Sequence, residues 1–357
     1  MLQNEIIDKR KQKDFKNITF SKFKKSDAKK QLLQSLLASK VEDSCYWSAE
    51  LICSGYFLYL WEIIFYFMGK HIHIGNPRLP LYINMRLDNF KDIINAGYTS
   101  NLLKLRNNEK IRKIFGEIMC VLCYSKKKNS YDIPKITDKE FNFINLTERL
   151  VAKNKNLGLA AFQNDDPNEI FVAINEFAWN IHYSNRDYFK ANYWIEWILE
   201  YHKICKKNKL VKECACRTGA VDTKFQKEMI WIIWDCIKRE ADRRKNSNLV
   251  KVIDGLENLF SLKYKSSTKN KRKLLIYNAV ALLCESYNIN SVIITNKKKV
   301  ENLKSKIDII YGQIKKNEEK PKTNYLFNNS MTNNEKNLEK TMNKLNKMDN
   351  LFFIPRN

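Results

Sequence analysis

Glycine, proline and histidine are scarce in this chain of 357 residues, with 9, 6 and 4 copies respectively. Folds made of β-sheets need frequent tight turns, which Gly and Pro supply, so this scarcity disfavours all-β folds and favours long helices joined by polar loops. The motifs GxxxxGK(S/T), GxGxxG, HExxH and GxSxG are all missing. Their absence argues against nucleotide hydrolysis and metalloprotease chemistry, and we expect no enzyme activity.

Long hydrophobic runs are also missing. The longest apolar stretch, Tyr56 to Met68, is interrupted by Glu62 and is well short of the ~20 residues that span a bilayer, so it predicts a buried core helix and no membrane contact. The first 30 residues carry ten Lys or Arg and no apolar run typical of a secretory signal. We therefore expect the nine Cys to be free thiols in an intracellular protein, located in the cytoplasm, the nucleus, a viral factory or a virion.

Apolar residues make up 44% of the chain and include 19 Phe, 17 Tyr and 7 Trp, which is enough to build a core. They recur at helical spacing along most of the sequence. We expect an all-α fold of about ten to twelve helices, either a multi-helix bundle or an irregular HEAT-like helical array with disordered termini.

Composition divides the chain into five predicted parts. We expect a basic flexible arm, an N-terminal helical domain, a linker loop, a C-terminal helical domain and a disordered tail, at residues 1–25, 26–124, 125–137, 138–316 and 317–357. Gly55 is suited to end a helix, and Asp166 followed by Pro167 is typical of a helix start. The segment at 291–295 is predicted to be a strand or a link between helices.

Positive charge is the strongest functional signal. The chain has 64 Lys and Arg against 39 Asp and Glu, a net charge of +25, although an AT-rich genome can inflate the number of Lys. Residues 263–273 (KYKSSTKNKRK) hold six cations, no acid and three hydroxyl groups before a helix start. This composition is suited to binding a sugar-phosphate backbone. The alternative is that the segment is simply a solvated helix face. The candidate nucleic-acid-binding residues are Lys263, Lys265, Lys269, Lys271, Arg272, Lys273, Lys238, Arg239, Arg243 and Arg244.

One grouping has metal-like spacing. The four residues His202, Cys205, Cys214 and Cys216 are candidate zinc ligands, because three thiols and an imidazole can form a tetrahedral site. The alternative is that Cys205 faces the core. Core packing also explains Cys120 and Cys123, and we expect His71 and His73 to lie in a surface loop with partly buried imidazoles.

The C-terminal end carries apolar residues on a polar tether. We expect Leu351, Phe352, Phe353 and Ile354 to dock into a groove of a protein partner or to fold back on the body.

Residues 35–77 contain Glu42 and Asp43, then Tyr46 and Trp47, Gly55, and finally Gly75-Asn76-Pro77. This order resembles the helical collar of clamp-loader-like AAA+ ATPases of the replication-restart type. Because the chain has no nucleotide-binding domain like that of the family, the resemblance implies a scaffold role alone. The same block is similar to uncharacterised helical proteins of large AT-rich DNA viruses.

We therefore expect a non-catalytic basic helical factor that binds nucleic acid without sequence preference and binds a protein partner, in replication, transcription or translation. The alternative is a structural or assembly protein of a virion, such as a minor capsid or genome-associated protein.

Overall fold

The computed structural model describes residues 4–98, 101–133, 135–210, 212–294 and 296–318. Contacts join the described residues as far as Asn317 into one compact unit. Within the described ranges every regular element is a helix, and the only β-type pairing is an isolated bridge between Ile18 and Lys24. The predicted all-α fold is confirmed. No helix in these ranges has the length and apolar character needed to cross a membrane.

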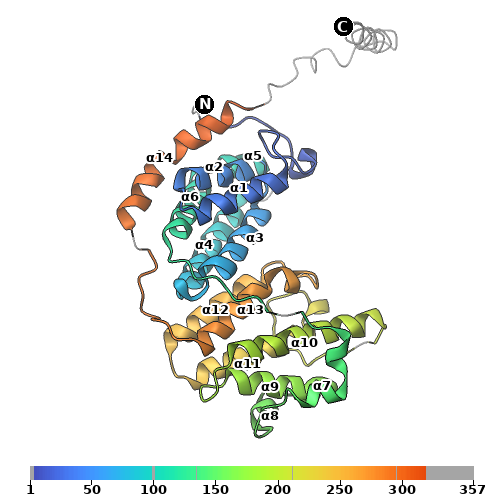
Figure 1. Cartoon of the computed structure of the whole chain (residues 1–357). Coiled ribbons are helices and arrows are strands. Elements are labelled where there is room, and N and C mark those ends of the chain that lie inside the picture. Colours follow the sequence, from blue (N-terminus) through green and yellow to red (C-terminus); the bar gives the residue numbers. More distant parts are fainter. Residues whose placement is uncertain (1–3, 99–100, 134, 211, 295, 319–357) are drawn as a thin grey trace, which may run out of the picture. The chain divides into compact units, whose positions relative to one another are not determined.

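The first half of the compact unit contains six α-helices (Figure 1). They are α1 (Lys25–Leu37), α2 (Val41–Cys53), α3 (Phe57–Phe67), α4 (Leu79–Ile93), α5 (Leu102–Asn107) and α6 (Glu109–Tyr124). Gly55 follows α2 with a φ of +72°, the left-handed conformation expected at this helix end. The Asn108 side chain caps α6 by accepting the N–H of Ile111 at 3.0 Å.

The second half contains the remaining helices. They are α7 (Phe143–Thr147), α8 (Asn156–Ala161), α9 (Phe171–Ile181), α10 (Tyr188–Lys207), α11 (Ile230–Arg243), α12 (Ser247–Ser261), α13 (Thr268–Cys284) and α14 (Lys297–Lys315). The last of these, α14, packs against α2 and α6 of the first half, so the helices do not divide at residues 125–137 into two separate groups. Residues 291–294, between α13 and α14, form neither helix nor strand and act as a link.

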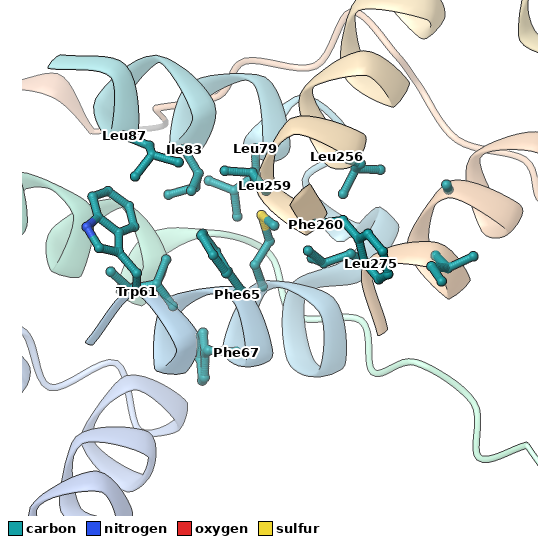
Figure 2. Close-up of a cluster of buried hydrophobic side chains, with 14 of the residues drawn as sticks. Trp61, Phe65, Phe67, Leu79, Ile83, Leu87, Leu256, Leu259, Phe260 and Leu275 are labelled. Atoms are coloured by element: carbon teal, nitrogen blue, oxygen red, sulfur yellow. The ribbon is translucent and has the colours of Figure 1, made fainter. Parts of the chain in front are cut away.

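A single hydrophobic core joins the two halves. Figure 2 shows Phe65 of α3 and Leu79 of α4 facing Leu259 and Phe260 of α12, and Trp61 of α3 farther from α12, toward Leu87 of α4. All six side chains are at most 2% exposed, and full burial of such a side chain stabilises a fold by about 1.5–3 kcal/mol. The contacts of α4 with α12 and of α3 with α13 therefore hold the compact unit together.

The start of α9 differs from the sequence prediction. Asp166 does not cap a helix; its carboxylate accepts N–H groups of Gln163 and Ala215 and pairs with Arg217. Helical structure begins as a short 3₁₀ turn at Asn168–Ile170, which leads into α9. The prediction was wrong because an Asp before a Pro looks the same whether its side chain bonds locally or to a distant residue.

Candidate nucleic-acid interface

The N-terminal segment, residues 4–24, is packed on the body and does not behave as the predicted flexible arm. Ile6, Phe15 and Phe20 are at most 1% exposed. The Phe20 N–H donates to Ser54 Oγ at 2.8 Å, and the Ser21 N–H donates to the Glu50 carboxylate at 2.6 Å. These apolar and polar contacts offset the entropy of ordering the segment.

Two side chains near α5 hold the backbone of this segment. The guanidinium of Arg106 donates to the carbonyl oxygens of Asp8 and Arg10 at 2.8 and 2.9 Å. The Asn107 amide exchanges two hydrogen bonds with the backbone of Ile6, at 2.9 and 2.8 Å. Since Arg106 is fully buried, the segment has a defined path over α5.

A tight turn then brings the segment back toward α1. The 3₁₀ helix η1 (Gln12–Phe15) is followed by Lys16 and Asn17 with φ of 45° and 66°, both left-handed. The Asn17 carbonyl oxygen accepts the N–H of Lys25 at 2.8 Å. This turn places the side chains of η1 and those at the start of α1 around the same space.

That space is a cavity of about 990 Å³, which we call the lysine cavity. Five of its lining residues are cations: Lys9, Lys11, Lys13, Lys16 and Lys25. The other lining residues are uncharged, namely Gln12, Asn17, Tyr56, Asn101, Leu102 and Leu103. No carboxylate belongs to this lining, and no ion pair between these five lysines and a described carboxylate is present. The lysine cavity is therefore suited to a ligand with several negative charges.

Lys25 is the least exposed of the five lysines. Its ammonium nitrogen lies 4.3 Å from the ring centroid of Tyr56 and 4.1 Å from that of Tyr59, which are cation–π distances. The Tyr56 hydroxyl donates to the carbonyl of Ile18 at 3.0 Å, so the ring is fixed in place. Burial lowers the pKa of Lys25, and an anion in the cavity would counter this by favouring the charged ammonium.

Most of the ten basic residues singled out from the sequence form ion pairs, four of them with acids elsewhere in the chain and three with acids about one turn away on α11. Seven of them are paired in this way, and only Lys263, Lys265 and Lys271 are exposed without an ion pair to a described residue. The pairs are Lys238 with Glu257, Arg239 with Asp235, Arg243 and Arg244 with Glu240, Lys269 with Glu228, Arg272 with Glu62 and Lys273 with Glu196.

Two members of this set are buried. Arg272 is 3% exposed and donates to the Glu62 carboxylate and to the carbonyl oxygens of Leu259, Phe260 and Leu262. Lys269 is 8% exposed and lies 3.1 Å from Glu228. These two side chains cannot reach a ligand at the surface, because their partners hold them between helices. They stabilise the fold.

The exposed lysines of the set have a less favourable setting than the lysine cavity. Lys263 and Lys265 line a cavity of about 450 Å³, together with the carboxylate of Asp222. A carboxylate in the lining repels a phosphate, so we expect this cavity to bind polyanions more weakly.

The four candidate zinc ligands do not gather. His202 Nδ1 lies 3.0 Å from the Lys269 ammonium, and Cys205 and Cys214 are buried. Cys216 is exposed and its thiol lies 3.4 Å from the side-chain oxygen of Gln226. Among the described residues no group of three or more His, Cys, Asp or Glu side chains could hold a metal ion. The spacing of these four residues along the chain does not fix where the fold places their side chains, so it could not show whether they meet.

The other candidates have simpler outcomes. Cys120 and Cys123 are buried in the core, as predicted. His71 is half-buried, but His73 is only 1% exposed, so the 71–73 loop is less accessible than expected. The proposed docking residues Leu351, Phe352, Phe353 and Ile354 lie outside the described residues.

The lysine cavity was only partly visible in the sequence. The basic clusters at Lys9–Lys13 and Lys22–Lys25 are evident, but the polar composition suggested a mobile arm. Phe15 and Phe20 were the signal that the segment folds back, because an exposed arm has no use for two such side chains.

No protein-family model, curated protein or solved structure matches this chain, and the resemblance of residues 35–77 to the helical collar stays a prediction.

Proposed function

We propose that this protein is a nucleic-acid-binding factor that holds a sugar-phosphate backbone in the lysine cavity. The observation that carries the proposal is the set of five lysines around one cavity whose lining contains no carboxylate. Each ammonium group can neutralise one phosphate and release its counterions, which is the main source of affinity in such complexes. The volume of about 990 Å³ suits several linked phosphates better than a single small anion.

Lysine favours binding without sequence preference. A Lys ammonium is a point charge on a flexible stem and reads phosphate charge, whereas sequence is read by hydrogen bonds to base edges. We therefore expect similar affinities for different sequences of the same length. A protein partner for the C-terminal residues remains part of the proposal, with the first half of the compact unit as a scaffold.

The test is the affinity of the full chain for a short fluorescent oligonucleotide, measured by anisotropy. The test variant Lys9→Gln/Lys13→Gln/Lys16→Gln removes three of the five charges. At about 0.1 M salt, with about 0.7 counterion released per contact, the affinity should fall by about 100-fold. A variant that lowers affinity by less than threefold, with its fold intact, would refute the proposal.

A matched control separates local from overall charge. The variant Lys153→Gln/Lys155→Gln/Lys251→Gln removes the same charge from exposed lysines that do not line the lysine cavity and that form no ion pair with a described residue. Its affinity should stay close to that of the wild type. Equal losses in both triple variants would mean that net charge alone drives binding.

A further inference from the structure

Three aromatic rings meet at the surface where the loop of residues 125–133 reaches the start of α10. Tyr131, Tyr188 and Phe189 line a cavity of about 350 Å³, which is within the usual range of small-ligand sites. Asn185, Arg186, Asp187 and Glu285 complete its lining. None of these residues belongs to the lysine cavity. We call Tyr131, Tyr188 and Phe189 the aromatic platform.

The rings of the aromatic platform touch one another. The ring centroids of Tyr131 and Phe189 are 5.0 Å apart, those of Tyr131 and Tyr188 are 5.4 Å apart, and those of Tyr188 and Phe189 are 5.5 Å apart. At these distances an ammonium group does not fit between the rings, as it would in an aromatic cage. Tyr131 is 42% exposed and Phe189 is 54% exposed, and their ring planes are tilted by 52°, so a flat ligand can stack on one of these two rings at a time.

The loop that carries Tyr131 is held firmly. The N–H groups of Lys128 and Ser130 donate to the carbonyl oxygens of His71 and Lys70, at 3.0 and 2.7 Å. Gly75 allows a close approach, because a Cβ at this position would lie 2.3 Å from the carbonyl oxygen of Lys126. The ring of Tyr131 is thus positioned before any ligand arrives, and the entropy cost of binding is small.

The side of the platform formed by α10 is equally fixed. The Asp187 carboxylate caps α10 by accepting the N–H of Lys190 at 2.9 Å. The Asp187 N–H donates to the carbonyl oxygen of Asn180 at 2.9 Å, and the Asn185 amide donates to the side-chain oxygen of Asn180 at 3.0 Å. Arg186 has a φ of 52°, a conformation that a non-glycine residue seldom adopts and that is concentrated at functional sites.

Buried polar atoms lie close to the platform. The Tyr188 hydroxyl, Glu285 Oε1 and both ring nitrogens of His73 are buried there, and the Tyr188 hydroxyl lies against Ser130. The ring centroid of His73 lies 6.2 Å from that of Tyr188, and His73 itself has a φ of 48°. Burial lowers the pKa of His73 to about 4, so its ring is neutral at physiological pH.

The net charge of the groups around the rim of this cavity is positive. Asp187 pairs with Lys190 at 3.3 Å and Glu285 pairs with Lys128 at 2.7 Å. Arg186 donates from Nε to the Tyr183 carbonyl oxygen and forms no ion pair within the described ranges. A guanidinium without an ion pair to a described residue, beside exposed rings, suits a ligand that combines a flat ring with a phosphate, and it opposes a cationic ligand.

We infer that the aromatic platform stacks an unpaired nucleobase and that Arg186 binds the phosphate next to that base. This inference rests on the proposed function and narrows its ligand to single-stranded nucleic acid, because bases paired in a duplex do not expose their faces. Stacking is insensitive to sequence, since every base has a π-face.

The test compares two ligands with the same number of phosphates, an oligothymidylate and a chain of abasic residues of equal length. The full chain should bind the oligothymidylate more tightly. In the variant Tyr131→Ala/Phe189→Ala the affinity for the oligothymidylate should fall by about five- to 150-fold, the range for one stacked base, and the affinity for the abasic chain should not change. Tyr183→Ala is the matched control, because Tyr183 is as exposed as Phe189 (54%) but does not line the cavity.

The outcomes separate this inference from the proposed function. Equal affinity for both ligands, with no effect of Tyr131→Ala/Phe189→Ala, would overturn the platform and leave backbone binding in place. If the lysine-cavity variant binds as the wild type does, backbone binding fails instead. Titration with thymidine monophosphate, followed by NMR, then tests the platform alone. Chemical-shift changes that occur in the wild type and are abolished in Tyr131→Ala/Phe189→Ala would support the platform, and a wild type without such changes would refute it. Displacement of the nucleotide by tetramethylammonium would show a cation site and overturn the assignment.

Discussion

Replacing Asp166 with asparagine should destabilise the compact unit strongly. The Asp166 side chain is fully buried and accepts four hydrogen bonds, from the N–H groups of Gln163 and Ala215, at 2.7 and 2.9 Å, and from two nitrogens of Arg217. Arg217 is itself 4% exposed and donates also to the carbonyl oxygens of Ala215 and Ala161. The pair joins the segment before α9 to the loop before α11.

The size of the effect follows from what the substitution leaves behind. An asparagine has no negative charge, and its NH₂ group would face donors on one side of the site. Removing one partner of a buried ion pair costs about 3–5 kcal/mol, because the other charge stays buried. Arg217 keeps a second carboxylate, Asp235, at 3.2 Å, so we expect the lower end of this range, about 3 kcal/mol.

The assay is urea unfolding of the full chain, followed by the fluorescence of its seven Trp. A double-mutant cycle with Arg217→Met isolates the coupling between the two side chains. In Asp166→Asn/Arg217→Met the buried charge is gone, so the double variant should be less destabilised than the sum of the single variants. A cost below about 1 kcal/mol for Asp166→Asn, the size of an ordinary hydrogen bond, would refute the reasoning, as would additive single variants.

The same pair makes stability depend on pH. Burial alone would raise the pKa of Asp166, but the hydrogen bonds from Arg217, Gln163 and Ala215 and the charge of Arg217 outweigh it and hold the pKa below its ordinary value of 3.8. The stabilisation is therefore fully present above the unfolded-state pKa and is lost as the pH falls through the lower folded-state pKa. Asp166→Asn should remove this acid-dependent part, which urea unfolding between neutral and acidic pH would detect.

Three further predictions concern residues whose roles changed between sequence and structure. Arg272→Gln should lower the free energy of unfolding by about 3 kcal/mol, because the carbonyl oxygens of Leu259, Phe260 and Leu262 lose a buried donor and Glu62 loses its ion-pair partner. Lys271→Gln should change it by less than about 0.5 kcal/mol in the same urea assay. Gly75→Ala should cost about 1–3 kcal/mol and weaken binding of the oligothymidylate more than of the abasic chain, since the added Cβ displaces the loop that carries Tyr131. Among the nine Cys only Cys216 is exposed, so a thiol reagent should modify one residue rapidly in the native protein, and Cys216→Ser should abolish that phase.

Local patterns predicted much of the fold. The spacing of apolar residues located most helices, and Gly55 marked a helix end. These features depend on neighbours a few positions away along the chain. Short helices such as α5, with six residues, carry too few positions for a periodicity to emerge.

Long-range partners explain what the sequence could not show. Arg272 lies 210 residues from Glu62, and Arg217 lies 51 residues from Asp166. A basic run along the chain looks the same whether its members face solvent or are paired with distant acids. The lysines of the lysine cavity are the reverse case. Their sequence predicted a mobile arm, but two buried Phe residues anchor that segment to the body.

The salt dependence of oligonucleotide binding tests the central claim most directly. If all five lysines of the lysine cavity contact phosphates, the plot of log K against log salt for a single strand should have a slope of about −3.5, and in Lys9→Gln/Lys13→Gln/Lys16→Gln it should flatten to about −1.4. The Lys153→Gln/Lys155→Gln/Lys251→Gln control should keep the wild-type slope. Identical slopes in the wild type and in the lysine-cavity variant would contradict the account, because the phosphates would then be neutralised elsewhere.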